Sequence, residues 1–188
     1  MNFAKRWLII LPALALLAAP AFADEYADTL EVFRKAGESG QFFGKSYGYA
    51  VFPTIGKGGV GLGGAHGTGR VYAGGNYVGD TSMTQVTLGF QLGGQAYSQM
   101  IFFQDKKAFD RFTSGNFAFG AHANAVAITA SASAQATTSG SGAGASATKH
   151  NAATVSAYQD GMAVFTVAKG GLMYEASIGG QKYSYKPN

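Results

Sequence analysis

Ten glycines fall within residues 56–75, between apolar runs of the kind that form β-strands, and this density constrains the possible folds most strongly. The segment opens with GKGGVGLGG, in which Gly59, Gly61 and Gly64 match the nucleotide-binding spacing G-x-G-x-x-G. That fingerprint requires a helix to begin at the third glycine, because the helix N-terminus holds the phosphates. Gly64 instead leads into AHGTGRVYAGG, which contains no helical run. The glycines therefore predict bends in a curved sheet, and room for a ligand against the backbone is compatible with that interpretation.

Short apolar or alternating runs separated by glycine dominate the chain from about residue 47 onward. In TQVTLGFQL, the large apolar residues from Val86 to Leu92 alternate with smaller or polar ones, which predicts a strand whose Val86 face is buried. The run AVFTVAKGGLMYEASI (163–178) predicts a hairpin. We expect a mainly β (α+β) fold, with an antiparallel, strongly curved or barrel-like sheet of about nine to twelve short Gly-rich strands.

Two helices are expected beside this sheet. Residues 24–40 carry an apolar stripe that includes Tyr26, Leu30 and Phe33, and they contain five acidic and two basic residues. A helix docked on the core is favoured there over one that inserts into a membrane. A short helix is predicted near 105–114, with Asp105 as its cap. Its phenylalanines, like those of the preceding IFF run, are expected in the core.

The N-terminus has the pattern of a secretory signal peptide. Lys5 and Arg6 precede an apolar run, and AFA supplies the small residues of a cleavage site before Asp24. We expect a cleaved signal peptide over 1–23, with an uncleaved membrane anchor as the alternative. A single domain over 24–188 follows, with a flexible Ala/Ser/Gly-rich segment at about 130–150. The expected location is the periplasm or the extracellular space, or the surface of a membrane as a peripheral protein.

Composition and motifs exclude several classes of function. The chain has no cysteine, so it forms no disulfide and cannot carry the lipid that bacterial export attaches to a thiol. Without Lys5 and Arg6, 12 basic residues stand against 10 acidic ones, a balance that does not suggest nucleic-acid binding. The three histidines share no metal-ligand spacing, and no nucleophile elbow or acid/base pair stands out. No catalysis, metal or cofactor is expected.

Three runs, in this order, resemble the SYLF domain family: YGYAVFPTIGKGGVGLGGAHGTGRVY, TLGFQLGGQAYSQMIFFQDKKAFDRF and DGMAVFTVAKGGLMYEASIGG. The order is more specific than any one run, and the match covers residues 28–186. The resemblance implies a lipid-binding module. Eukaryotic members bind phosphoinositides and membranes, some yeast members bind actin filaments, and bacterial members are exported and carry the domain alone.

This sequence departs from the family pattern at two points. Membrane contact in the eukaryotic members is attributed to an amphipathic helix at the start of the domain, whereas the corresponding helix here, 24–40, is net acidic. The actin-binding members use basic segments and partner domains that this sequence does not show. An exported protein does not normally meet actin, so actin binding is not expected.

The resulting prediction is a non-catalytic, envelope-located module that binds a phospholipid or phosphoinositide-type head group. Its partner would be an anionic phospholipid or membrane surface. Cations near the glycine-rich segment or on the short helix would meet the head group: Lys45, Lys57, Arg70, Lys106, Lys107 and Arg111. The alternative is a structural or protein–protein interaction protein of the envelope without a lipid ligand. The sequence does not predict the oligomeric state.

Overall fold

The computed structural model describes residues 24–89, 94–128, 158–169 and 178–188. Its helices are α1 (Glu25–Lys35), α2 (Gly37–Gly40) and α3 (Lys106–Thr113). Its strands are β1 (Gly48–Ala73), β2 (Asn76–Gly89), β3 (Gln95–Phe103), β4 (Phe117–Ala118), β5 (Val126–Ile128), β6 (Met162–Lys169) and β7 (Lys182–Pro187). The predicted signal peptide, the small-residue segment at 130–150 and the second arm of the hairpin expected over 163–178 lie outside the described residues.

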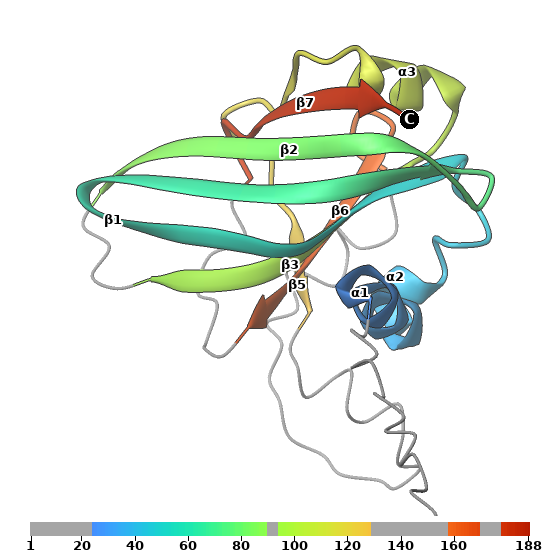
Figure 1. The fold of residues 1–188 in the computed structure, drawn as a ribbon, viewed down its shortest axis with the longest axis horizontal. Helices are drawn as coiled ribbons and strands as arrows, with labels where there is room; N and C mark the ends of the chain where they lie inside the picture. Colours follow the sequence, from blue (N-terminus) through green and yellow to red (C-terminus); the bar gives the residue numbers. More distant parts are fainter. Residues whose placement is uncertain (1–23, 90–93, 129–157, 170–177) are drawn as a thin grey trace, which may run out of the picture.

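β1 folds back on itself inside the glycine-rich segment, so that its two halves lie side by side (Figure 1). A Cβ built on Gly69 would lie 2.6 Å from the Val51 carbonyl oxygen, and one on Gly59 would overlap the Cα of Gly63. Gly59 also has a φ of 146°, which residues with a side chain rarely adopt. GKGGVGLGG is therefore the turn between two closely paired strand segments, as the prediction of tight bends required.

The strands form one open sheet in the order β4-β7-β2-β1-β3-β6-β5. The first half of β1 pairs with β3 and the second half with β2. The curvature predicted from the glycines is confirmed (Figure 1). Two parts of the fold prediction were wrong. The described residues form seven strands, or eight when the halves of β1 are counted separately, and β5 runs parallel to β6.

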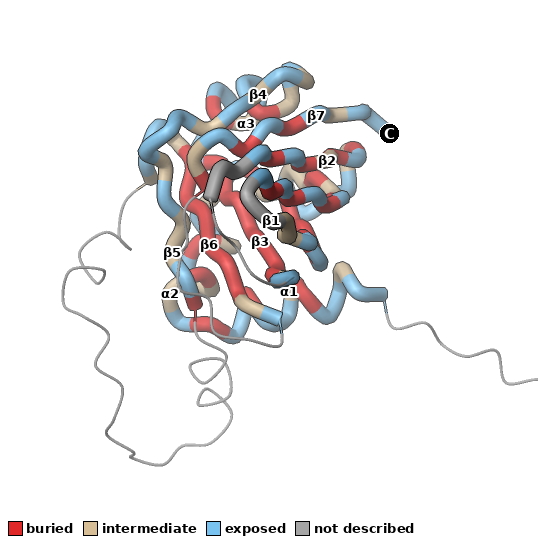
Figure 2. The backbone as a smooth tube through the Cα atoms, turned by 90° about the vertical axis from the view of Figure 1, so that its left-hand side faces the viewer, coloured by how far each residue is buried: buried red, intermediate tan, exposed pale blue. Residues whose placement is uncertain are grey.

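Both faces of β3 are buried, and each face belongs to a different core. Ile101 and Phe103 face the concave interior, which β7, α3 and Ile178 help to close. Met100 and Phe102 face the opposite side, where Phe33 of α1 packs with Phe42 beyond α2. β6 is likewise buried along most of its length (Figure 2). The continuous apolar runs of these two strands follow from this burial on both faces.

β2 alternates as predicted, but with the opposite face inward. Val86, expected in the core, is 70% exposed, whereas Thr81, Met83 and Gln85 are buried. The buried polar side chains have partners from the end of the chain. Gln85 donates to the Gly179 carbonyl at 2.8 Å, and the Thr81 hydroxyl donates to the Ser184 carbonyl at 2.7 Å. These hydrogen bonds offset the cost of burying polar groups, so Val86 is left facing outward.

The predicted helices are present, one of them interrupted. Residues 24–40 form two helices because Ala36 is extended, with a ψ of 125°. Asp24 caps α1 by accepting a hydrogen bond from the Tyr26 amide at 3.2 Å. Asp105 caps α3 as predicted, by accepting from the Ala108 amide at 2.8 Å. The phenylalanines expected in the core are fully buried at Phe102, Phe103 and Phe112, and Phe109 is partly buried with its ring centroid 5.7 Å from that of Phe103.

Candidate functional site

The six cations predicted to meet a head group belong to three separate segments: α3, the residues after α2, and β1. Lys106, Lys107 and Arg111 are exposed on α3, where Lys106 pairs with Asp110 at 2.7 Å and Arg111 donates to the Asp160 carbonyl. Lys45 is exposed after α2, close to the end of β1 where the Gly74 amide bonds to Tyr47.

Lys57 and Arg70 are both on β1 but lie apart. Lys57 lies near the turn, opposite Gln95 of β3. Arg70 lies near the other end, because its neighbour Gly69 lies against Val51. Six residues of extended chain between Val51 and Lys57 correspond to about 20 Å. The structure therefore does not gather the predicted cations into one cluster.

A different group of polar side chains is brought together by strand register. The second half of β1, β2 and β7 are adjacent, and directly paired residues lie on the same face. On the convex side this gives three rows across three strands, which we call the outer face. Its rows are His66–Thr84–Lys182, Thr68–Ser82–Ser184 and Arg70–Asp80–Lys186.

The outer face is exposed to solvent, and the opposite face of the same strands is packed. Arg70 and Ser82 are half-buried and the other seven residues are exposed. Lys182 and Lys186 form no ion pair within the described parts of the chain, and the hydroxyls of Ser82 and Ser184 are 2.7 Å apart. The sequence analysis missed both lysines. The alternation in KYSYK, with a polar residue at every second position, was the available signal.

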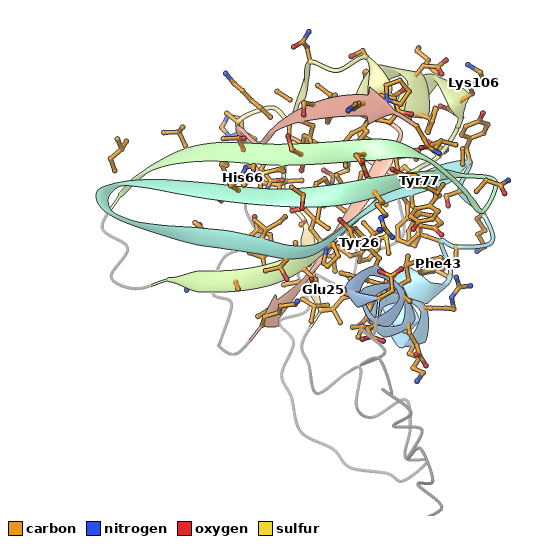
Figure 3. All side chains as sticks on the ribbon, in the orientation of Figure 1. Glu25, Tyr26, Phe43, His66, Tyr77 and Lys106 are labelled. Carbon is orange, nitrogen blue, oxygen red and sulfur yellow. The ribbon has the colours of Figure 1, made fainter. Side chains whose placement is uncertain are left out.

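One end of the outer face is joined to α1 through Arg70. Its guanidinium lies over the Tyr26 ring at 4.0 Å, and its Nη1 lies 3.3 Å from the Asp24 carboxylate. Tyr77 donates to Asp80 at 2.8 Å on the same side of the sheet. Figure 3 shows Tyr26 and Tyr77 near this end, with His66 farther along β1. Because Arg70 already has an anionic partner, it contributes less free positive charge than the two lysines.

A second polar contact holds α1 against the sheet. Glu25 accepts hydrogen bonds from Lys169 of β6 at 2.8 Å and from the Thr54 hydroxyl of β1 at 2.6 Å. The Lys169 hydrogen bond, followed by the one from Thr54, lowers the pKa of Glu25 below its ordinary value. Glu25 therefore remains ionised down to mildly acidic pH. The start of α1 is attached both to the outer-face arginine and to the two strands beneath it.

The concave interior contains a polar network with no charged member. Gln99 donates to the Tyr183 hydroxyl at 2.7 Å and to Gln181 Oε1 at 3.1 Å, and Gln181 donates to the Tyr97 hydroxyl at 3.1 Å. Burial raises the pKa of Tyr97 to about 12, and burial also raises the pKa of Tyr183 well above its ordinary value. Both hydroxyls are neutral at physiological pH, so this network hydrogen-bonds across the core and supplies neither an acid nor a base at neutral pH.

The described part of the chain offers neither a cluster of metal ligands nor an apolar helix of membrane-spanning length. Within residues 24–89, 94–128, 158–169 and 178–188, no three His, Asp or Glu side chains are grouped so that they could hold a metal ion. None of the helices in that part of the chain is long and apolar enough to cross a membrane.

Comparisons with known proteins give one family and one curated relative. The family model Ysc84, described as Las17-binding protein actin regulator, matches residues 84–187. This match covers more than half of the chain and includes the end of β2 from Thr84 onward and all the strands from β3 to β7. The relative, beta cell expansion factor A of Aeromonas veronii, is 30% identical over 166 residues, which is 84% of this chain and 53% of that protein. The chain thus spans about half the length of the curated relative that it matches.

Proposed function

This chain belongs to the Ysc84 family, whose domain is also called SYLF, and from that premise we propose that it is a non-catalytic module that binds anionic phospholipid in the cell envelope. The resemblance first noted across 28–186 supports the module, and the signal-peptide pattern of residues 1–23 supports export. The family description names actin regulation, but an exported protein would not meet actin. Lipid binding is the property that we carry over to this chain.

The outer face is the surface that we assign to the head groups, and its lysines carry the assignment. Lys182 and Lys186 project from alternate positions of β7, about 13 Å apart along the strand. Serine and threonine hydroxyls lie between them and can donate to phosphate oxygens. An anionic surface would lie against the whole face, because the sheet places these side chains in registered rows.

Vesicle co-sedimentation of the exported protein tests this assignment. At low salt, the protein should pellet with vesicles containing phosphatidylglycerol and should remain in solution with vesicles of phosphatidylcholine alone. A charge near an anionic surface contributes about 1 kcal/mol, so K182Q together with K186Q should weaken binding about thirty-fold. The loss should shrink as salt is raised, since added ions screen the attraction.

The matched control removes two charges from α3. K106Q together with K107Q makes the same change in net charge and includes two of the cations that the sequence analysis selected. It should weaken binding much less than the β7 pair. An equal or larger loss from the α3 pair would move the lipid surface to α3. Equal pelleting with neutral and anionic vesicles would reject binding through charge, and failure to pellet with either would leave the envelope interaction protein as the better description.

A further inference from the structure

The two most exposed large hydrophobic residues of the described chain lie next to each other. Leu62 is 63% exposed and Val86 is 70% exposed, whereas the next most exposed, Tyr47, reaches 40%. Leu62 lies beside the turn within β1, and Val86 lies opposite Gly64 on the neighbouring strand. They are diagonal neighbours across one strand pair, within reach of each other's side chains.

Both residues continue the outer face toward the end of the sheet that is remote from α1. The β1–β2 register places them on the same side as the row His66–Thr84–Lys182. Gly64 lies between Leu62 and His66 and adds no side chain, so nothing large separates the apolar pair from His66 along β1. Leu62 is four residues from His66, or about 13 Å along the strand. The face thus changes from apolar at its free end to cationic and hydroxyl-bearing behind it.

We infer that Leu62 and Val86 insert into the bilayer interface while the cations behind them contact the head groups. This inference rests on the proposed lipid binding and names the part of the protein that enters the membrane. The occupant is a bilayer rather than a protein groove, because an apolar end followed by positive charge matches the order of acyl chain and phosphate in a membrane. Amphipathic segments bury their apolar side by about 5–10 Å at this boundary, so an outer face that lies along the membrane and tips toward its free end would bury this pair and keep the rows behind it at the level of the phosphates.

This arrangement differs from insertion of the N-terminal helix. The apolar side of α1 is already used, since Phe33 is fully buried in the core that α1 shares with β3 and β6. Val32, the exposed apolar residue of α1, is only 37% exposed. The free end of the β1–β2 pair is therefore the better candidate for entering the membrane.

A polarity-sensitive dye on single cysteines tests the inference, since the chain has no cysteine of its own. V86C, N76C and V32C place the dye at the free end of β2, at the opposite end of β2, and on α1. With phosphatidylglycerol-containing vesicles, the dye at position 86 should shift to the blue and be quenched by lipids spin-labelled in the upper acyl chain. The dyes at positions 76 and 32 should stay in a water-like environment.

A second measurement does not depend on a label. L62S together with V86S should weaken partition into the same vesicles about tenfold, with little change in its salt dependence. Thermal unfolding of this variant should match that of the unsubstituted protein, because both side chains are exposed. Pelleting with an unshifted dye at position 86, or a blue shift at position 32 instead, would overturn the insertion of Leu62 and Val86. It would leave the proposal of lipid binding in place. Failure of the unsubstituted protein to pellet would overturn both proposals.

Discussion

β3 and β6 differ from the second half of β1 and β2 in how many of their faces are covered, although all four belong to one sheet. β3 and β6 have α1 and α2 on one side and the concave core on the other, and nearly every residue in them is buried. β2 and its partner half of β1 are packed only on the concave side (Figure 2). Side chains of β3 and β6 pack into two cores, whereas every second side chain of β2 and of the second half of β1 faces solvent.

This difference separates stability from binding. Substitutions in β3 should change the free energy of unfolding, because its residues from Tyr97 to Phe103 are all buried. On the outer face, substitutions should leave the fold intact and change only what the protein contacts. The proposed lipid surface can therefore vary in sequence without loss of the fold. The strongest tests of the comparison are pairs of substitutions, one in each region.

The largest expected effect comes from Phe102 of β3. Its ring is fully buried and lies 5.0 Å from Phe43, 5.5 Å from Phe42 and 5.9 Å from Phe165, measured between ring centroids. Phe102→Ala should lower the free energy of unfolding by about 3–5 kcal/mol, since it leaves a cavity between the sheet and the helices. Leu62→Ala on the outer face should change it by less than about 0.5 kcal/mol. Denaturant unfolding of both variants measures the contrast, and similar losses would contradict it.

The next effect concerns two neighbours that both face the concave core. Gln99 and Thr166 are directly paired across β3 and β6, and both are fully buried. Gln99 is hydrogen-bonded to Gln181 and Tyr183, whereas the Thr166 hydroxyl has no partner among the described residues. Gln99→Leu should lower the free energy of unfolding by about 1–3 kcal/mol, because it leaves the buried groups that Gln99 contacts without that hydrogen-bond partner.

Thr166→Val should act in the opposite direction. It removes a buried hydroxyl that has no described partner and keeps the shape of the side chain, so stability should rise by about 1 kcal/mol. Thermal unfolding distinguishes the two variants by the sign of the change in melting temperature. Destabilisation by Thr166→Val would mean that its hydroxyl has a partner, such as an ordered water, that the described residues do not supply.

Local signals predicted those parts of the fold that depend on neighbours in sequence. The cap at Asp105 and the apolar run ending at Phe103 each depend on residues that are close in sequence, and both are present as expected. The phase of β2 depends on distant partners. Period two indicates that one face is buried, but only Gly179 and Ser184, about a hundred residues later, make it favourable to bury Gln85 in place of Val86.

The candidate site was less predictable for the same reason. Lys182 joins His66 in one row only because β7 returns to pair with β2, and that pairing is non-local. Arg70 was selected as a cation, but its partner Asp24 lies on the helix that docks beside it. Charge and spacing identify cations that are available to bind. The sheet order decides which of them share a surface.

The smallest expected effect concerns the attachment of α1. This helix helps to cover the face of β3 and β6 that lies opposite the concave core. Glu25→Gln removes the charge that Lys169 contacts, and the helix start should loosen on the sheet. Because the pair is exposed, the loss should be no more than about 1 kcal/mol. Amide hydrogen exchange should show faster exchange in α1, with β3 unchanged. Glu31→Gln is the matched control, since Glu31 pairs with Lys35 within the same helix.

The lowered pKa of Glu25 sets the pH range over which Glu25→Gln should have an effect. The Lys169 hydrogen bond lowers the pKa of folded Glu25, so its contribution is complete above the unfolded carboxyl pKa of about 4.3 and is lost as pH falls through the lower folded value. The difference in α1 exchange between the unsubstituted protein and Glu25→Gln should thus be constant from pH 7 to about pH 5 and vanish in stronger acid. If Glu31→Gln loosens α1 equally, the sheet contact is not what holds the helix. The packing of α1 and α2 over β3 and β6 would then depend only on the buried phenylalanines of the core between them.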